Sequence, residues 1–348
     1  MVFLLYVDII TCRFVAMQLS YSFIVPVYNR PDEILELLES FAKQETKLPY
    51  EIVIIEDGST IPCKSVIAQF EQLNITYLVK ENSGPGSSRN YGMERAAGNY
   101  FIILDSDCML PPQYISSINT ALQANYVDCF GGPDAAHPSF SKLQKAISYS
   151  MTSFFTTGGI RGGTEKTGKF QPRSFNMGLS KKAFEASGGF GKIHPGEDPD
   201  LVLRLWKLGF KTTLLTDAFV YHKRRISWKK FYTQVNKFGL VRPILNNWHP
   251  ESKKITYWFP SLFMIGFVIG SLCSLFGLYW FLQLYAFYFF IIFIHSTILS
   301  KSIKIGLMSV IATIIQFYGY GRGFLSSVIQ VQWLKKLPQK QYPHLFFK

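Results

Sequence analysis

The feature that most constrains this chain is the stretch from Ile255 to Ser300, which contains no Asp, Glu, Lys or Arg. As a helix rising about 1.5 Å per residue it would extend roughly 70 Å, enough to cross a hydrocarbon core of about 30 Å twice. The chain therefore divides into a charged part, up to about residue 250, and a membrane region over residues 251–334. In that region we expect helices at about 256–276 and 279–299, with a tight turn near Gly277.

A third apolar segment, residues 305–334, contains the sequence Gly319-Tyr320-Gly321-Arg322-Gly323. We expect these glycines to break it, which leaves either one tilted crossing helix or two pieces lying partly in the interface. Lysines flank the apolar segments, as is typical of cytoplasmic loops: Lys253, Lys254, Lys301, Lys304, Lys335 and Lys336. Two crossings plus an interfacial or re-entrant third segment keep all of them, and the basic tail at 335–348, on the cytoplasmic side of the cell (inner) membrane.

The net charge of +13 would suit nucleic acid. The chain carries no recognisable nucleic-acid-binding motif, however, and its lysines cluster beside apolar segments, as expected for contacts with anionic lipid. Membrane lipids are therefore the expected partner and nucleic acid is not. The five cysteines include no Cys-x-x-Cys pair, which argues against a disulfide framework and a zinc site and fits a reducing, cytosolic location.

Residues 1–16 form an apolar leader that is too short to span a membrane. It lacks the basic start and small-residue cleavage site of a signal peptide. Because Met17 immediately precedes the first strand, we interpret residues 1–16 as an added or mis-started leader, expected to be poorly ordered.

Residues 17–250 alternate between short apolar runs and amphipathic segments. The apolar runs predict strands at 21–27, 51–55, 75–79 and 100–104, with helices beginning near Pro31, Pro62 and Ser88. Strict alternation indicates an α/β domain with a parallel sheet covered by helices on both faces. Later strands are expected at 174–179, 211–215 and 219–221, and helices at 141–155, 181–186 and 197–208.

The acidic sequence Asp105-Ser106-Asp107 comes directly after the strand at 100–104. Open α/β sheets bind ligands at the carboxyl ends of their strands. Two carboxylates separated by one small residue can both reach a hard cation such as Mg²⁺ or Mn²⁺. The alternative is an acidic turn that caps the following helix.

Five motifs follow one another along the chain: Pro26-Val27-Tyr28-Asn29-Arg30, Glu56-Asp57-Gly58-Ser59, Gly84-Pro85-Gly86-Ser87-Ser88-Arg89-Asn90, Asp105-Ser106-Asp107 and Gly196-Glu197-Asp198. Together, over about residues 20–225, they resemble the motifs of inverting family 2 glycosyltransferases. The resemblance implies a GT-A (Rossmann-like) nucleotide-diphospho-sugar transferase domain followed by C-terminal transmembrane helices.

The resemblance also implies roles for individual residues. The nucleotide would be contacted by Pro26, Tyr28, Arg30, Asp57, Gly84, Arg89 and Ser106, and Mg²⁺ or Mn²⁺ would be held by Asp105, Asp107 and His222. Arg89 would either hold a phosphate or anchor the acidic pair, and His222 would be either a ligand or a structural histidine. Asp198 would be the general base, with Glu197 as the alternative because adjacent carboxylates cannot be ranked from sequence.

The expected reaction is metal-dependent, inverting transfer of a sugar from a nucleotide-diphosphate donor to a hydroxyl of a lipid-linked or growing glycan, in cell-surface polysaccharide or glycoconjugate synthesis. The Gln-x-x-Arg-Trp signature of processive synthases is absent, so single-sugar addition is expected. A glycine-rich segment at 158–163 and the membrane helices would present the acceptor. Two alternatives remain: a polyprenyl-phosphate sugar synthase, and an inactive membrane-anchored scaffold.

Overall fold

The structure is a computed structural model that describes residues 18–135, 137, 139–158, 170–223 and 227–347. The expected leader, residues 1–16, lies outside the described residues. The glycine-rich segment at 158–163 also lies outside the described residues, except for Gly158, which has a left-handed conformation after helix α6.

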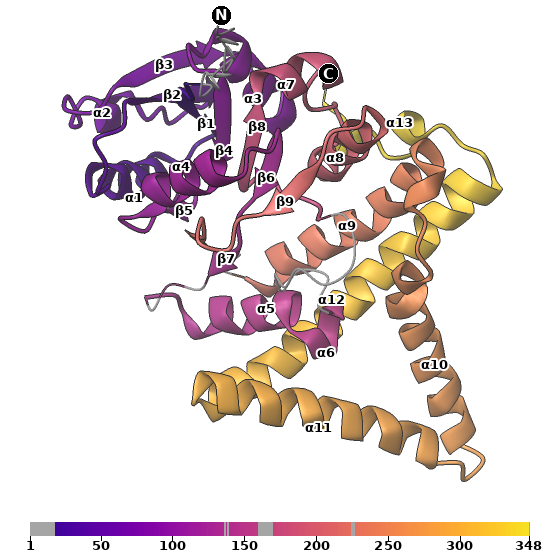
Figure 1. Ribbon diagram of the computed structural model, residues 1–348. Helices are drawn as coiled ribbons and strands as arrows, with labels where there is room; N and C mark the ends of the chain where they lie inside the picture. Colours follow the sequence, from indigo (N-terminus) through magenta and orange to yellow (C-terminus); the bar gives the residue numbers. More distant parts are fainter. Residues whose placement is uncertain (1–17, 136, 138, 159–169, 224–226, 348) are drawn as a thin grey trace, which may run out of the picture.

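The domain is built on a seven-stranded sheet with the order β3-β2-β1-β4-β8-β6-β9 (Figure 1). Its first four strands along the chain are β1 (Tyr21–Val27), β2 (Tyr50–Asp57), β3 (Ile75–Lys80), which forms one edge, and β4 (Tyr100–Leu104). β2 and β4 each pair in parallel with β1, and β3 pairs in parallel with β2. All five residues of β4 are buried, as expected for an apolar strand covered on both faces. The four strands predicted from the apolar runs are thus confirmed, with ends shifted by one or two residues.

The parallel arrangement does not extend across the whole sheet. Strand β8 (Asn176–Ser180) lies antiparallel between β4 and β6 (Cys129–Gly131), and β9 (Thr212–Leu214) pairs in parallel with β6. The prediction of a wholly parallel sheet is therefore wrong at β8, while β6 and β9 run in the same direction as β4. Because β8 is antiparallel to β4, it starts at the edge of the sheet where β4 ends, and no crossover helix is needed to reach it.

A second sheet of three short strands has the order β5-β10-β7. Its members are β5 (Cys108–Met109), β10 (Val220–His222) and β7 (Asp134–Ala135). The antiparallel pairing of β10 with β5 sets His222 opposite Cys108. The histidine is thereby brought beside the acidic motif that ends at Asp107.

Helices cover both faces of the main sheet. One apolar core joins it to α1 (Pro31–Ala42) and α4 (Tyr114–Ala124), and the other joins it to α3 (Pro85–Arg95), α7 (Lys181–Ser187) and α8 (Glu197–Lys207). Helix α3 starts at Pro85 rather than Ser88, since proline suits a first helical turn. Helix α2 (Lys64–Ile67) is only four residues long where a helix over about 62–73 was predicted.

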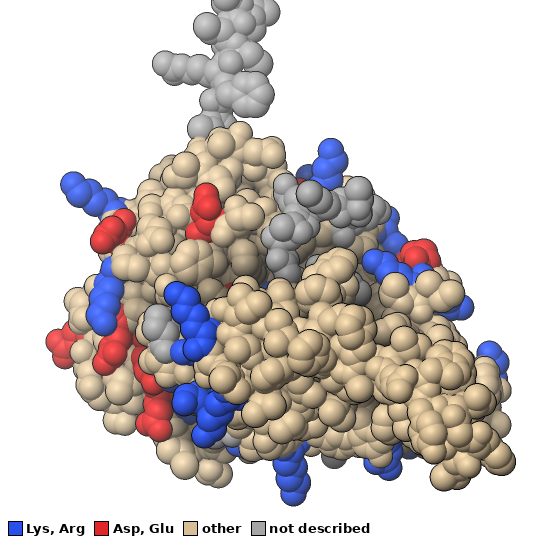
Figure 2. Space-filling view, turned by 90° about the horizontal axis from the view of Figure 1, so that it is seen from below, with Lys and Arg blue, Asp and Glu red and all other residues tan. Residues whose placement is uncertain are grey.

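The C-terminal third of the chain is helical, with α9 (Trp228–Trp248), α10 (Phe259–Ser274), α11 (Trp280–Ser300) and α12 (Ile303–Ser327). Two single turns, η1 (Pro250–Ser252) and η2 (Ile255–Trp258), join α9 to α10. Three helices are long and apolar enough to cross a membrane: Ile255–Ser274, Trp280–Ser300 and Ile303–Trp333. Seen from the side of α11, the surface is broadly free of charged residues and has Lys and Arg along its margins (Figure 2). Gly277, with φ of +82°, forms the turn that was expected between the first two apolar helices, α10 and α11.

The glycines in the third apolar segment do not break its helix, contrary to the prediction. Helix α12 continues into a π-helix, η3 (Val328–Trp333), and packs along α9, which sequence analysis did not predict (Figure 1). A Cβ on Gly319 would lie 2.6 Å from Val235 Cγ2, and one on Gly323 would lie 2.3 Å from the carbonyl oxygen of Asn236. The glycines therefore permit close approach of two helices, as small residues commonly do in membrane proteins.

Two further segments connect the membrane helices to the α/β domain. Helices α5 (Lys142–Thr152) and α6 (Phe154–Thr157) contact α11, since the Tyr149 hydroxyl lies 2.8 Å from His295 Nδ1 and the Tyr288 hydroxyl donates to the Phe155 carbonyl at 2.8 Å. After η3, the turns α13 (Pro338–Gln341) and η4 (Pro343–Leu345) bring the chain back to α8 (Figure 1). The expected basic tail is thus packed rather than extended, with Leu345 fully buried.

Candidate active site

Arg89 joins two acidic motifs that lie about 90 residues apart in sequence, at Asp105 and Glu197. One of its Nη atoms is 2.7 Å from Asp105 Oδ1 and the other is 3.0 Å from Glu197 Oε1. The side chain is 3% exposed and its guanidinium faces the ring of Phe190. Burial alone would lower the pKa of Arg89, but the two carboxylates raise it above its ordinary value. Arg89 thus contacts both acidic motifs directly.

Glu197, at the start of α8, has a second basic neighbour besides Arg89. His194 Nδ1 lies 3.0 Å from Glu197 Oε1. Burial would raise the pKa of Glu197, but His194 and Arg89 lower it to about 2. A carboxylate that is buried, ionised and shared by two bases is poorly suited to accept a further proton. His194 was not predicted, since a single loop histidine three residues before Glu197 gives no signal in the sequence.

Asp107 and His222 form the candidate metal centre. His222 Nε2 lies 3.1 Å from Asp107 Oδ1, and the imidazole stacks on Phe175 with ring centroids 4.7 Å apart. Among the described residues, Cys108 completes the group of possible ligand atoms within 4.8 Å of one another. The predicted pair of Asp107 with His222 is brought together, whereas Asp105 turns instead to Arg89.

The donor set at this centre fits Mg²⁺ or Mn²⁺ through oxygen and nitrogen rather than sulfur. Burial, together with Asp107 and Asp105, raises the pKa of the Cys108 thiol well above its usual range, so the thiol stays protonated. It also donates a hydrogen bond to the Phe175 carbonyl at 3.4 Å. The carboxylate is a ligand type that suits both Mg²⁺ and Mn²⁺.

Asp57 lies beneath the loop that begins α3. Its Oδ1 accepts from the Ser83 amide at 2.9 Å and from Lys80 Nζ at 2.6 Å, and its Oδ2 accepts from the Gly84 amide at 2.9 Å. Gly84 has φ of +86°, a conformation that glycine adopts without strain. The carboxylate therefore fixes the backbone of the glycine-rich loop in addition to any contact with a ligand.

The remaining predicted nucleotide residues gather around the carboxyl end of β1. Tyr28 is 51% exposed, so its ring is available to a base, and Pro26 lies in β1 opposite Ile55. Arg30 pairs with Glu33 across 3.6 Å at the start of α1. Ser106 Oγ donates to the second oxygen of Glu33 at 2.7 Å. Glu33 thus connects two predicted residues, a role that its place in an ordinary first helical turn did not indicate.

Asp198 is partly exposed and lies 3.6 Å from Arg173 Nη1. Arg173 belongs to the segment before β8, which had no predicted role. Arg173 was not predicted because its partner, Asp198, comes from a different part of the chain. The neighbouring Asp200 instead lies 2.8 Å from His249 Nε2 and 2.9 Å from Arg204 Nη2, and so anchors α8 to the end of α9.

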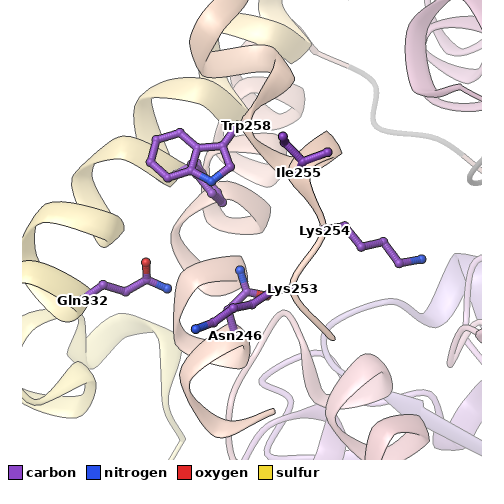
Figure 3. Close-up of a pocket in the computed structure, with 7 residues that line it drawn as sticks. Asn246, Lys253, Lys254, Ile255, Trp258 and Gln332 are labelled. Atoms are coloured by element: carbon purple, nitrogen blue, oxygen red, sulfur yellow. The ribbon is translucent and has the colours of Figure 1, made fainter. Parts of the chain in front are cut away.

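A separate hollow of about 320 Å³ lies among α9, η2, α12 and η3 (Figure 3). It is lined by Asn246, Lys253, Lys254, Ile255, Trp258, Phe324 and Gln332. Asn246 is 6% exposed and its side-chain oxygen has no hydrogen-bond partner. None of the acidic residues described above takes part in this lining.

A sheet of this order, with an acidic pair after β4 and a second pair opening α8, is the arrangement expected of a GT-A fold. A family model described as Glycosyl transferase family 2 matches residues 22–187. The chain is 30% identical to glycosyltransferase AglE of Haloferax volcanii over 59% of its own length and 67% of that protein. The chain therefore belongs to glycosyltransferase family 2.

Two other similarities differ in extent. Over 26% of this chain it is 34% identical to TarS of Staphylococcus aureus, a poly(ribitol-phosphate) β-N-acetylglucosaminyltransferase, but it spans only 16% of that protein's length. The solved structure of the mannosyltransferase PcManGT of Pyrobaculum calidifontis, in complex with GDP-Man and Mn²⁺, has a TM-score of 0.56 and 14% identity. That alignment covers 91% of this chain and 88% of PcManGT, which extends the shared fold into the helical region.

Proposed function

We propose that the enzyme transfers a sugar from a nucleotide-diphosphate donor to a hydroxyl of a lipid-linked or growing glycan, with inversion and with the aid of Mg²⁺ or Mn²⁺. The observation that carries this proposal is the bridge from Asp105 through Arg89 to Glu197. It ties the motif proposed to meet the donor to the helix start that carries Asp198. The motif proposed to bind the donor and the residue proposed to activate the acceptor therefore lie close together.

The donor would lie along the carboxyl edge of the sheet. Tyr28 offers an exposed ring for a base, and Asp57 holds the loop whose amides precede α3, where a helix N-terminus favours phosphate. Asp107 and His222 would hold the divalent ion, which offsets the negative charge that develops on the departing diphosphate. The GDP-Man and Mn²⁺ bound in the PcManGT complex support this donor class and this ion.

Asp198 is the proposed general base. In a single displacement the acceptor hydroxyl attacks the anomeric carbon opposite the leaving group, and a carboxylate on that side removes its proton. Glu197 is already shared by Arg89 and His194, which leaves Asp198 as the more accessible of the pair. The neighbour of Asp198 at this position is Arg173, 3.6 Å away.

The acceptor side and the membrane location belong to the same proposal. The apolar helices and the flanking lysines support an enzyme held in the cell (inner) membrane with its catalytic domain on the cytoplasmic side. Helices α5 and α6 lie between the α/β domain and α11, where an acceptor anchored in lipid would pass. This supports synthesis of a cell-surface polysaccharide or glycoconjugate.

The test is a binding panel on the purified full-length protein in detergent. UDP-, GDP- and dTDP-sugars are each titrated with Mn²⁺, with Mg²⁺ and with a chelator, and thermal stability is recorded. We expect one nucleotide class to raise the melting temperature only when the metal is present, and the His222→Ala variant to need about tenfold or more Mn²⁺ for the same shift. Stabilisation by no sugar nucleotide, or equal stabilisation with the chelator, would contradict the proposal.

A further inference from the structure

The segment that follows the π-helix is firmly packed against the α/β domain. Tyr342 and Leu345 are buried in a cluster that includes Ile193 of the loop before α8 and Val241 of α9. A segment that buries side chains in this way is held against the domain rather than free in solvent. Its last described residues therefore have a defined position relative to the active site.

Backbone hydrogen bonds join this segment to the loop that opens α8. The His194 amide donates to the Leu345 carbonyl at 2.7 Å, and the Phe347 amide donates to the Lys192 carbonyl at 3.0 Å. Ile193 and Phe346 pair as an antiparallel bridge. Residues 345–347 thus form a short extra strand beside the loop that leads to Glu197 and Asp198.

The ring of Phe347 lies directly on Gly84. A Cβ placed on Gly84 would be 2.3 Å from two carbons of that ring, so only a glycine leaves room for it. The amide of Gly84 is the one that donates to Asp57 Oδ2. The aromatic ring therefore covers the glycine whose backbone Asp57 fixes.

The same ring also faces the other side of the site. The centroids of Phe347 and His194 are 5.9 Å apart, and His194 contacts Glu197, which is bound to Arg89. One side chain thus touches both the loop before α3 and the loop before α8. Those two loops are the ones that would have to keep a fixed spacing when a donor binds between the acidic motifs.

We propose that Phe347 is a positioning residue of the donor site, which holds the Gly84 loop and the His194 loop in the arrangement that binds the sugar nucleotide. The proposal deepens the proposed function and rests on it for the identity of the ligand. The physical basis is preorganisation: a loop ordered before binding spares the complex the entropy of ordering it.

The test compares Phe347→Ala with Phe346→Ala in the full-length protein. Neighbouring residues of a strand point to opposite sides, and Phe346 faces Trp248, with centroids 6.3 Å apart, rather than Gly84. Both variants lose one aromatic ring from the same short strand, so the second controls for lost packing. Phe347→Tyr keeps the ring and serves as the conservative rescue.

Two measurements are made. The first is hydrogen exchange of the amides at 81–88 without nucleotide, which we expect to quicken about tenfold in Phe347→Ala and to stay near wild type in Phe346→Ala and Phe347→Tyr. The second is affinity for GDP-mannose and UDP-N-acetylglucosamine with Mn²⁺. We expect about tenfold weaker binding of whichever nucleotide the wild type accepts, again in Phe347→Ala alone.

The two measurements separate failure of the inference from failure of the proposed function. If wild type binds no sugar nucleotide, the proposed function fails, and the exchange data still decide whether Phe347 holds the loop. Unchanged exchange in Phe347→Ala overturns the inference. So does tighter nucleotide binding in that variant, because it would mean that the ring obstructs the site. Should Phe347→Ala fail to fold, Phe347→Leu carries the same comparison with an apolar side chain that lacks the ring.

Discussion

At the scale of single residues, the contrast between Glu197 and Asp198 decides how the site can work. Adjacent in sequence, the two carboxylates face different surroundings: Glu197 is buried between Arg89 and His194, whereas Asp198 is partly exposed beside Arg173. A proton acceptor in catalysis must reach the substrate, and a residue that fixes an arginine must not move. The environment therefore separates two roles that the residue types alone leave equal.

Asp198→Asn is expected to lower sugar transfer at least about 10²-fold while leaving donor affinity unchanged, because it removes the proton acceptor without changing the shape of the site. Turnover is measured with a lipid-linked acceptor, and donor affinity is measured separately. Glu185→Gln, on the exposed surface of α7, is the matched control for loss of a carboxylate. An Asp198→Asn enzyme that stays active would point to a phosphate acceptor and hence to a polyprenyl-phosphate sugar synthase.

Glu197→Gln is expected to destabilise the protein by about 3–5 kcal/mol near neutral pH, because it leaves the buried Arg89 with one partner fewer. The pKa of Glu197 is lowered to about 2 in the folded protein. A lowered pKa means that the ionised carboxylate contributes stability above its unfolded pKa, near 4.3, and that this contribution is lost as pH falls toward 2.

The melting temperature of wild type and variant, recorded in detergent from pH 7 to pH 3, checks this expectation. The gap between them should be full at pH 7 and should narrow once the pH falls below about 4.3. A gap that is constant with pH would show that the variant disturbs packing rather than the ion pair.

At the scale of secondary-structure elements, prediction succeeded where the information is local. The strands at 21–27 and 100–104 are short apolar runs between turn residues, and the motifs after them fall at strand ends because strand direction fixes that edge. The direction of β8, the helix α9 and the contact of Phe347 with Gly84 depend on partners far away in sequence. Periodicity carries no information about such partners.

The glycines at 319–323 in helix α12 show the same limit of sequence-based prediction, because glycine can either weaken a helix or allow another helix to approach closely. Glycine weakens an isolated helix by about 1 kcal/mol relative to alanine, which is why a break was predicted at 319–323. The structure uses those glycines to bring α12 against α9. The two interpretations predict opposite changes in stability when one of these glycines is replaced by alanine.

Gly323→Ala is expected to lower stability by about 1–3 kcal/mol, since the new Cβ would lie 2.3 Å from the Asn236 carbonyl oxygen and the helices would have to separate. Were the glycine only a helix breaker, alanine would raise stability instead. Thermal unfolding in detergent distinguishes the two signs. Ile311→Ala on the exposed face of α12 controls for a substitution that does not meet α9.

At the scale of the whole molecule, the α/β domain and the membrane helices form one connected unit. Asp200 of α8 contacts His249 at the end of α9, α9 packs along α12, and the segment after α12 returns to the loop before α8. Catalytic and membrane parts therefore share a closed path of contacts. An enzyme arranged in this way keeps its site at a fixed height relative to the apolar helices, which suits an acceptor held in lipid.

In the proposed membrane location, the hollow between η2 and the end of α12 would lie at the level of the membrane surface (Figure 3). Lys253 and Lys254 line it together with Trp258, and tryptophan and lysine are the residues that gather at the lipid–water interface. Each lysine near the surface contributes about 1 kcal/mol toward anionic lipid, or roughly a fivefold preference. We therefore expect tryptophan fluorescence in mixed vesicles to be quenched more by brominated phosphatidylglycerol than by brominated phosphatidylcholine.

In the double variant Lys253→Ala/Lys254→Ala that preference should fall by roughly fivefold for each lysine, at unchanged total incorporation into vesicles. Lys301→Ala/Lys304→Ala removes the same charge from a loop that does not line the hollow, so it should leave the preference at this site largely intact. An equal loss of lipid preference in both double variants would mean that total positive charge, rather than the lysines of the hollow, attracts the lipid. The hollow would then not mark the level of the membrane surface, and the height assigned to the active site would have to be revised.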